Sequence, residues 1–280
     1  MSAKNSSLGF LPRSSPIHSL TGATKLIMTI LCSIAVMITY DTRFLAGMIL
    51  LAIGMFALSK IRFREIWSVV VFITIFMIIN VVAITLFSPE EGVKIYGTRH
   101  EIGHLFGNYY LTQEQLFYLL NVVLKYFSVL PMAILFITTT QPSEFASSLN
   151  RIGVSYKIAY SVALTLRYIP DIKRDYVEIS QAQQARGIDI SRNVSLSQRV
   201  RNVSFILLPL VLSSLSRIDT ITNAMELRGF GKHPKRTWYS ARPFRRRDFA
   251  AIGICVLLLI VSILMNVRNH GRFFNPFTAS

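Results

Sequence analysis

The chain has 280 residues, of which 52% are hydrophobic and only 16% are charged, whereas about a quarter of the residues of a soluble domain are charged. A mean hydropathy of +0.46 and several long apolar runs exclude an ordinary soluble domain and predict a membrane protein. The formal charge of +16 predicts basic surfaces near anionic headgroups. Nucleic-acid binding is not expected, because the basic residues alternate with apolar ones and no stacking motif appears.

Five apolar runs predict membrane-spanning helices, so the expected fold is an all-α membrane protein. They cover residues 24–40, 43–59, 66–88, 116–140 and 249–267. A helix needs about 20 apolar residues to cross the hydrocarbon core, which the third and fourth runs supply easily. The first two runs are short and predict a tight, tilted helical hairpin.

The placement of Lys and Arg predicts the orientation. Segment 141–248 holds eighteen Lys and Arg against eight Asp and Glu, and the short loop 60–65 is also basic, whereas loop 89–115 is acidic. Basic loops stay in the cytosol. The predicted order is a cytosolic tail at 1–23, four spans at 24–140 with the external loop 89–115, a cytosolic domain at 141–248, and a last span with an external tail at 249–280.

The cytosolic domain is expected to contain three amphipathic helices, over about 142–150, 156–186 and 196–228. Pro170 and Pro209 predict kinks in the second and third helices. The charged residues after Pro170, from Asp171 to Glu178, predict a solvated face with pairs between residues three or four positions apart.

The second and third helices are expected to end in similar short blocks, whose arginines are 42 positions apart. The blocks are Ala185-Arg186-Gly187, with Ala182 before it, and Leu227-Arg228-Gly229, with Ala224 and Glu226 before it. In one interpretation each glycine ends a helix and each arginine complements the helix dipole. In the other, two matched arginines bind carboxylates or carbonyls in the grooves of a partner.

Several motifs in order resemble the transmembrane T component of energy-coupling factor (ECF) transporters, the EcfT/CbiQ family. They are TTTQPSEF at 138–145, LNRIGV at 149–154, LRYIP at 166–170, AQQARG at 182–187, AMELRGF at 224–230 and RRRD at 245–248. The resemblance is close from about 138 to 250. The family pattern has two Ala-Arg-Gly blocks, and this chain has Leu227 where the second block has alanine.

The resemblance implies a non-catalytic subunit that links two ABC-type ATPases to one small substrate-binding S subunit in the membrane. The two Arg-Gly ends would insert into grooves on the ATPases, and ATP hydrolysis would drive uptake of a vitamin or a metal ion. The chain has no G-x-x-x-x-G-K-[ST] loop, so ATP and Mg²⁺ are expected on the partners and no cofactor is expected on this chain.

Two alternatives come from other motifs. His100-Glu101-x-x-His104 matches a zinc metalloprotease helix, in which both histidines would bind zinc and the glutamate would act as general base. Tyr110 stands where a third histidine ligand would be, and the loop is too short for a protease cleft, so no metal is expected. The second alternative is an ordinary ABC importer permease, whose cytosolic coupling loop is weakly matched by Glu178, Ala182, Gly187 and Leu208-Pro209. The spacing from Gly187 to Leu208-Pro209 is too long for that loop, and the two Arg-Gly ends would be unexplained.

Overall fold

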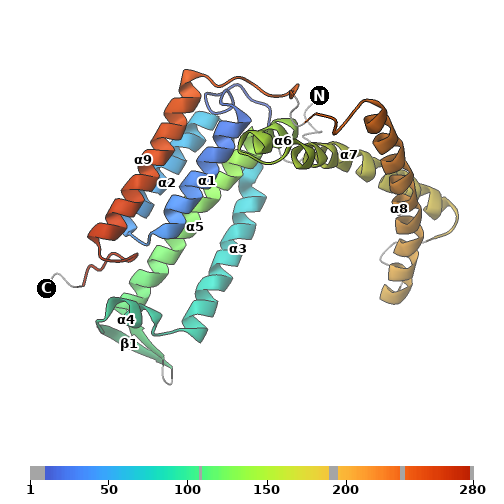
Figure 1. The fold of residues 1–280 in the computed structure, drawn as a ribbon. Coiled ribbons are helices and arrows are strands. Elements are labelled where there is room, and N and C mark those ends of the chain that lie inside the picture. The colour runs from blue at the N-terminus through green and yellow to red at the C-terminus, as the bar shows by residue number, and fades with distance from the viewer. Residues whose placement is uncertain (1–9, 107–108, 189–194, 234–236, 278–280) are drawn as a thin grey trace. The chain divides into compact units, whose positions relative to one another are not determined.

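The structure is a computed structural model that describes residues 10–106, 109–188, 195–233 and 237–277. The chain divides into two compact units. The first unit combines Met1–Gln141 with Arg242–Ser280, and the second is Pro142–Ala241. Both units are built mainly from helices, so the predicted all-α membrane fold is confirmed (Figure 1).

The first unit contains five long helices that match the five predicted runs. They are α1 (Gly22–Ile38), α2 (Thr42–Ser59), α3 (Phe63–Phe87), α5 (Gln113–Thr139) and α9 (Arg246–Arg268). In Figure 1, α1 lies beside α9 and α5, and α2 packs on α5. Small side chains such as Cys32, Ala35 and Cys255 let these helices approach closely around Leu45 and Met48.

Helix α3 contributes little to this core. Of its residues only Ile66 is buried, and large side chains such as Phe72 and Phe87 are exposed. It contacts α5 within the first unit. An apolar helix with so small a buried face requires lipid or another protein around it.

By length and composition, the described helices able to cross a membrane are α2, α3, α5, α9 and α8 (Leu196–Leu227). This set includes α8, which was not predicted to span the membrane, and lacks α1, which was. At 17 residues, α1 is about 26 Å long and needs tilt or local thinning to cross a core of about 30 Å. Helix α8 has the lowest mean hydropathy of the set, 1.4, and carries Arg199, Arg201 and Arg217. Its place outside the membrane stays a prediction.

The segment between α3 and α5 is structured. It forms the short helix α4 (Glu91–Tyr96) and a hairpin of β1 (Glu101–Phe106) and β2 (Tyr109–Thr112). The two strands pair antiparallel, with irregular register on either side of Gly103 and His104. The helix that the His100-Glu101-x-x-His104 motif would need is therefore not formed, because Gly103 and the aromatic residues around it favour extended backbone over helix.

The second unit contains α6 (Pro142–Arg151), α7 (Tyr156–Ala185) and α8, close to the three predicted helices. Helix α7 continues through Pro170 and α8 through Pro209. Ser155 caps α7, because its side chain accepts a hydrogen bond from the Ile158 N–H. Helices α7 and α8 pack against each other, and Arg186 and Arg228 at their C-terminal ends are exposed.

Candidate functional site

Helix α7 ends in a Schellman motif. The Gly187 N–H donates to the Gln184 carbonyl oxygen at 2.9 Å, and the Ile188 N–H donates to the Gln183 carbonyl oxygen at 3.1 Å. Such a motif needs a left-handed residue after the helix. Gly187 has φ of +86°, a conformation that glycine adopts without steric cost.

The end of α8 repeats this arrangement. The Gly229 N–H donates to the Glu226 carbonyl oxygen at 2.8 Å, and the Phe230 N–H donates to the Met225 carbonyl oxygen at 2.9 Å. Gly229 has φ of +68°. Every donor and acceptor lies 42 positions after its counterpart on α7. Arg186 and Arg228 therefore occupy the same position, the C-cap immediately before the glycine.

Both ends present a surface of mixed character. Arg186 and Arg228 are exposed, and Leu227 is 90% exposed. The neighbouring exposed residues are Ala182, Ala185, Ala224 and Glu226. Arginine is enriched at protein contacts at the expense of lysine, and the exposed Leu227 adds apolar area beside Arg228. The two ends thus share a backbone motif and differ in the side chain before the arginine.

An ion pair joins α7 to α8. The Arg217 Nη2 atom donates to the Asp175 Oδ2 atom at 2.6 Å. The predicted solvated face holds for Asp171 and Arg174, which pair three positions apart at 2.8 Å. It was wrong for Asp175, whose partner lies 42 positions away on another helix. Local spacing rules could not reveal this contact.

The end of α8 is held against the start of α7 by aromatic rings. The Phe230 ring lies 4.9 Å from that of Tyr160 and 5.6 Å from that of Tyr156, between centroids. Trp238 follows in the chain, lies 6.3 Å from Tyr160, and its Nε1 atom donates to Asn150 Oδ1 at 3.1 Å. These contacts fix the Leu227-Arg228-Gly229 end relative to α6 and α7.

The His100-Glu101-x-x-His104 sequence lies on β1 and its approach, and the zinc-protease geometry is not formed. Four residues of extended chain span about 13 Å, whereas the motif needs adjacent turns of one helix. His100 Nδ1 instead contacts Glu114 Oε1 at 2.6 Å. Within the described residues, no group of three or more His, Cys, Asp or Glu is placed to hold a metal ion.

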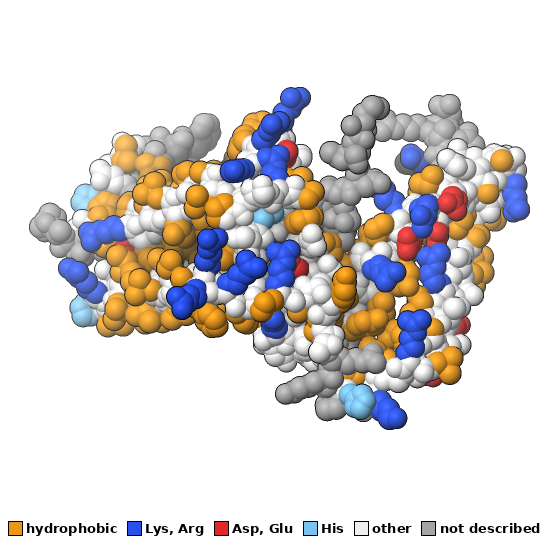
Figure 2. Space-filling view, turned by 90° about the horizontal axis from the view of Figure 1, so that it is seen from above, with side chains coloured by type: hydrophobic (Ala, Val, Ile, Leu, Met, Phe, Trp, Pro, Cys, Tyr) orange, Lys and Arg blue, Asp and Glu red, His pale blue; other side chains and the backbone are white. Residues whose placement is uncertain are grey.

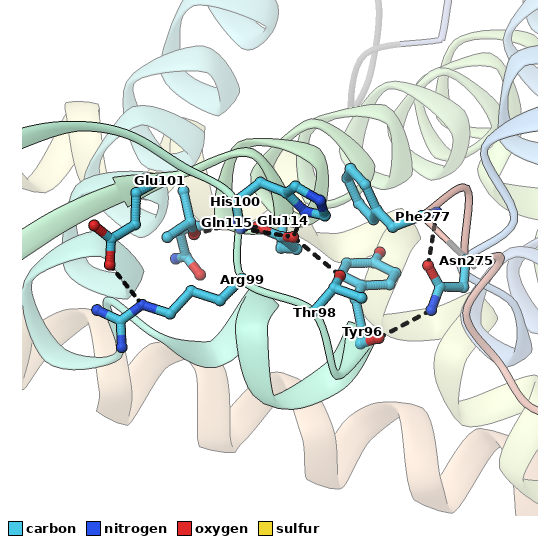
Figure 3. A network of polar contacts seen from close by, with 10 residues as sticks. Tyr96, Thr98, Arg99, His100, Glu101, Glu114, Gln115, Asn275 and Phe277 are labelled. Atoms are coloured by element: carbon cyan, nitrogen blue, oxygen red, sulfur yellow. Dashed lines mark hydrogen bonds and ion pairs between the residues drawn. The ribbon is translucent and has the colours of Figure 1, made fainter. Parts of the chain in front are cut away.

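Glu114, in the first turn of α5, is the centre of a polar network beside α4 and the β1–β2 hairpin (Figure 3). Its side chain is fully buried and also accepts from Thr98 Oγ1 at 3.0 Å and from the His100 N–H at 3.1 Å. The Phe277 ring stacks on His100, and Asn275 Nδ2 donates to the Tyr96 carbonyl oxygen at 3.0 Å. Burial raises the pKa of Tyr96 to about 12. The network ties the hairpin to the C-terminal residues and is structural.

Basic side chains are prominent on the surface. Figure 2 shows a face on which Lys and Arg side chains are far more frequent than Asp and Glu side chains and lie among apolar ones. A cavity of about 320 Å³ in the first unit is lined by Arg245, Arg246 and Arg247 with Ser19, Leu20 and Asp248. Such a mixture of basic and apolar side chains is typical of protein surface close to a membrane.

The apolar helices define a multi-pass membrane protein, and its second unit carries the paired Arg-Gly ends. The CbiQ family, described as cobalt transport protein, matches residues 13–239. Among relatives named energy-coupling factor transporter transmembrane protein EcfT, one from Leuconostoc gelidum subsp. gasicomitatum is 26% identical over 270 residues, covering 94% of this chain and 97% of its own. Another, from Streptococcus equi subsp. equi, is 28% identical over 266 residues, covering 89% and 92%.

The match covers most of the chain, so this protein belongs to the CbiQ/EcfT family of transporter membrane components. The resemblance inferred from the sequence motifs is confirmed.

Proposed function

We propose that this chain is the energy-coupling subunit of an ECF-type ABC importer. It links ATP hydrolysis in two cytosolic ATPase subunits to uptake of a vitamin or a metal ion through one membrane-embedded S subunit. The observation that carries the proposal is the repetition of one Schellman motif, with an exposed arginine at the same position, at the ends of two packed helices. Two matched ends suit two related partners.

The chemistry of each end supports docking into an acidic or carbonyl-lined groove. The Schellman motif uses the last carbonyl groups of the helix internally, and the exposed arginine side chain beside it can reach a partner. Its planar guanidinium carries five donors and binds carboxylates in two-pronged fashion. Small residues at Ala182 and Ala224 leave room for the walls of a groove.

ATP and Mg²⁺ belong to the partners in this proposal. The sequence contains no G-x-x-x-x-G-K-[ST] loop, and the role of the chain is to transmit movement rather than to catalyse a reaction. The basic loop 60–65 supports a cytosolic location for the N-terminus and for the second unit.

The test is a set of arginine variants in the full complex, purified through a tag on this chain. Arg186→Ala combined with Arg228→Ala is expected to abolish uptake and to detach the ATPases, because a buried acidic partner loses its cation at a cost of about 2–5 kcal/mol. Arg174→Ala is the matched control, because Arg174 is an exposed arginine of α7 paired only locally with Asp171 in the described contacts. Normal uptake by the double variant refutes the proposal.

A further inference from the structure

The Asp175–Arg217 ion pair lies at a special position along both helices. Asp175 stands eleven positions before Arg186 on α7, and Arg217 stands eleven positions before Arg228 on α8. At 1.5 Å per residue, each arm from the ion pair to its arginine is about 16 Å long. The segment of α7 from the ion pair to Arg186 therefore equals in length the segment of α8 from the ion pair to Arg228.

The same spacing sets the face on which each arginine lies. Eleven residues of α-helix turn through about 1100°, which is three full turns and about 20° more. Arg186 consequently lies on nearly the same face of α7 as Asp175. In the same way, Arg228 lies on nearly the same face of α8 as Arg217. The faces that carry the ion pair are thus the faces that carry the two arginines further along.

The ion pair is specific for one register. Its atoms are 2.6 Å apart, and the two side chains are only 17% and 34% exposed, so the contact is shielded from water more than a surface pair. A slip of one helical turn would displace the partners by about 5.4 Å and break the contact, whereas apolar side chains tolerate such slips. Polar contacts between helices commonly fix register in this way.

We propose that Asp175 and Arg217 are a positioning pair that holds α7 and α8 in one register, so that a displacement of one arginine end is transmitted to the other. This inference rests on the proposed coupling function. Without the pair, each end still docks on an ATPase, but displacement of one end is no longer passed fully to the other.

The experiment uses the full complex in proteoliposomes and measures uptake per ATP hydrolysed. Asp175→Asn and Arg217→Gln, which remove charge and keep volume, are each expected to lower this ratio on the order of fivefold or more, within the usual range for coupling between sites. The double neutral variant should be no worse than either single variant. The exchanged pair, Asp175→Arg with Arg217→Asp, should recover most of the ratio. Asp171→Asn, which removes a carboxylate paired only within α7 in the described contacts, is the matched control and should change little.

A distance measurement tests the register directly. Spin labels at Gln181 and Asn223, two exposed positions 42 apart and near the two ends, should give a narrow distance distribution in the unmodified complex. The distribution should broaden with Asp175→Asn and stay narrow with Asp171→Asn. A distribution that does not broaden with Asp175→Asn overturns the proposal.

The outcomes separate this inference from the proposed function. Normal coupling with both neutral variants, together with loss of uptake when Arg186 and Arg228 are replaced, overturns the positioning pair and leaves the coupling role intact. Normal uptake without the two arginines overturns the coupling role itself. If the neutral variants do not assemble, the exchanged pair decides: recovery supports the inference, and a defect equal to that of the neutral variants rejects it.

Discussion

The buried carboxylate of Asp248, at the start of α9, accepts a hydrogen bond at 2.9 Å from the N–H of Thr21, which lies 227 positions earlier and caps α1. The same Oδ1 atom accepts from Thr24 Oγ1 at 2.7 Å, and Oδ2 accepts from the Arg245 N–H at 2.8 Å. One side chain thus satisfies donors at the N-termini of two neighbouring helices. This contact helps to hold the first and last apolar helices of the chain side by side.

Asp248→Ala is expected to destabilise the first unit. The change leaves the buried N–H of Thr21, the part-buried N–H of Arg245 and the Thr24 hydroxyl without their acceptor, and the expected loss is about 3 kcal/mol. Thermal unfolding in detergent measures this loss. Asp248→Asn keeps one acceptor oxygen, so its unfolding temperature should lie between those of Asp248→Ala and the unmodified protein. Equal unfolding temperatures for Asp248→Ala and the unmodified protein would contradict the role given to this carboxylate.

Alanine at the two helix-ending glycines should weaken the Schellman motifs. Gly187 and Gly229 have open space where a Cβ atom would lie, so the cost of Gly187→Ala or Gly229→Ala is backbone strain alone, about 1 kcal/mol each. We expect faster amide exchange in the last turns of α7 and α8 and reduced uptake. Gly253→Ala is the control, because Gly253 lies in α9 and has open space within 4 Å of an added Cβ atom. This variant should change neither amide exchange at the ends of α7 and α8 nor uptake. Unaltered exchange in all three variants counts against the motif.

Replacing both histidines of the His100-Glu101-x-x-His104 sequence should leave transport intact. His100→Ala removes one of the donors to the buried Glu114, while Thr98 and the backbone still hold that carboxylate, so stability should fall by about 1 kcal/mol. The double variant His100→Ala with His104→Ala is measured for uptake, zinc content and thermal unfolding. Loss of bound zinc together with loss of activity would restore the metal-site interpretation.

Acidification should loosen the segment before α1. His18 Nε2 donates to the Leu11 carbonyl oxygen at 3.0 Å, and its Nδ1 accepts from Ser15 Oγ at 2.7 Å. Burial, with the nearby charges of Lys25 and Arg13, lowers the pKa of His18 below its usual value of about 6.5. As pH falls through about 6.5, the unfolded chain takes up this proton before the folded chain does, so stability decreases until the lower folded pKa is passed.

The measurement for His18 is the change in unfolding temperature between pH 7.5 and pH 5.5. His18→Gln keeps a hydrogen-bonding side chain without the titration, and it should show a smaller change than the unmodified protein. The difference between the two proteins isolates His18 from the other histidines. An identical change in both would show that the proton on His18 does not affect folding.

Much of this protein could be predicted from its sequence. Long apolar runs indicate spanning helices because a helix must cover the hydrocarbon core with apolar side chains, and all five runs became helices. The three helices of the second unit were also predicted nearly to their ends, since glycine after a helical run favours a left-handed cap. The family followed from motifs that are each contiguous in the chain. The orientation of these helices and the roles of Arg186 and Arg228 stay predictions.

Other features required the tertiary structure. The hairpin of β1 and β2 stands where the zinc-protease motif would need a helix, because pairing with residues 109–112 decides the conformation of 101–106. Asp175 looked like part of a solvated face until its partner on α8 was known, and Asp248 gave no sign that it caps α1 as well as α9. Sequence alone determined the helices and their ends, because helical period, hydropathy and capping are local properties. Tertiary structure decided which polar groups meet across 42 and 227 positions, because such contacts depend on how the helices pack.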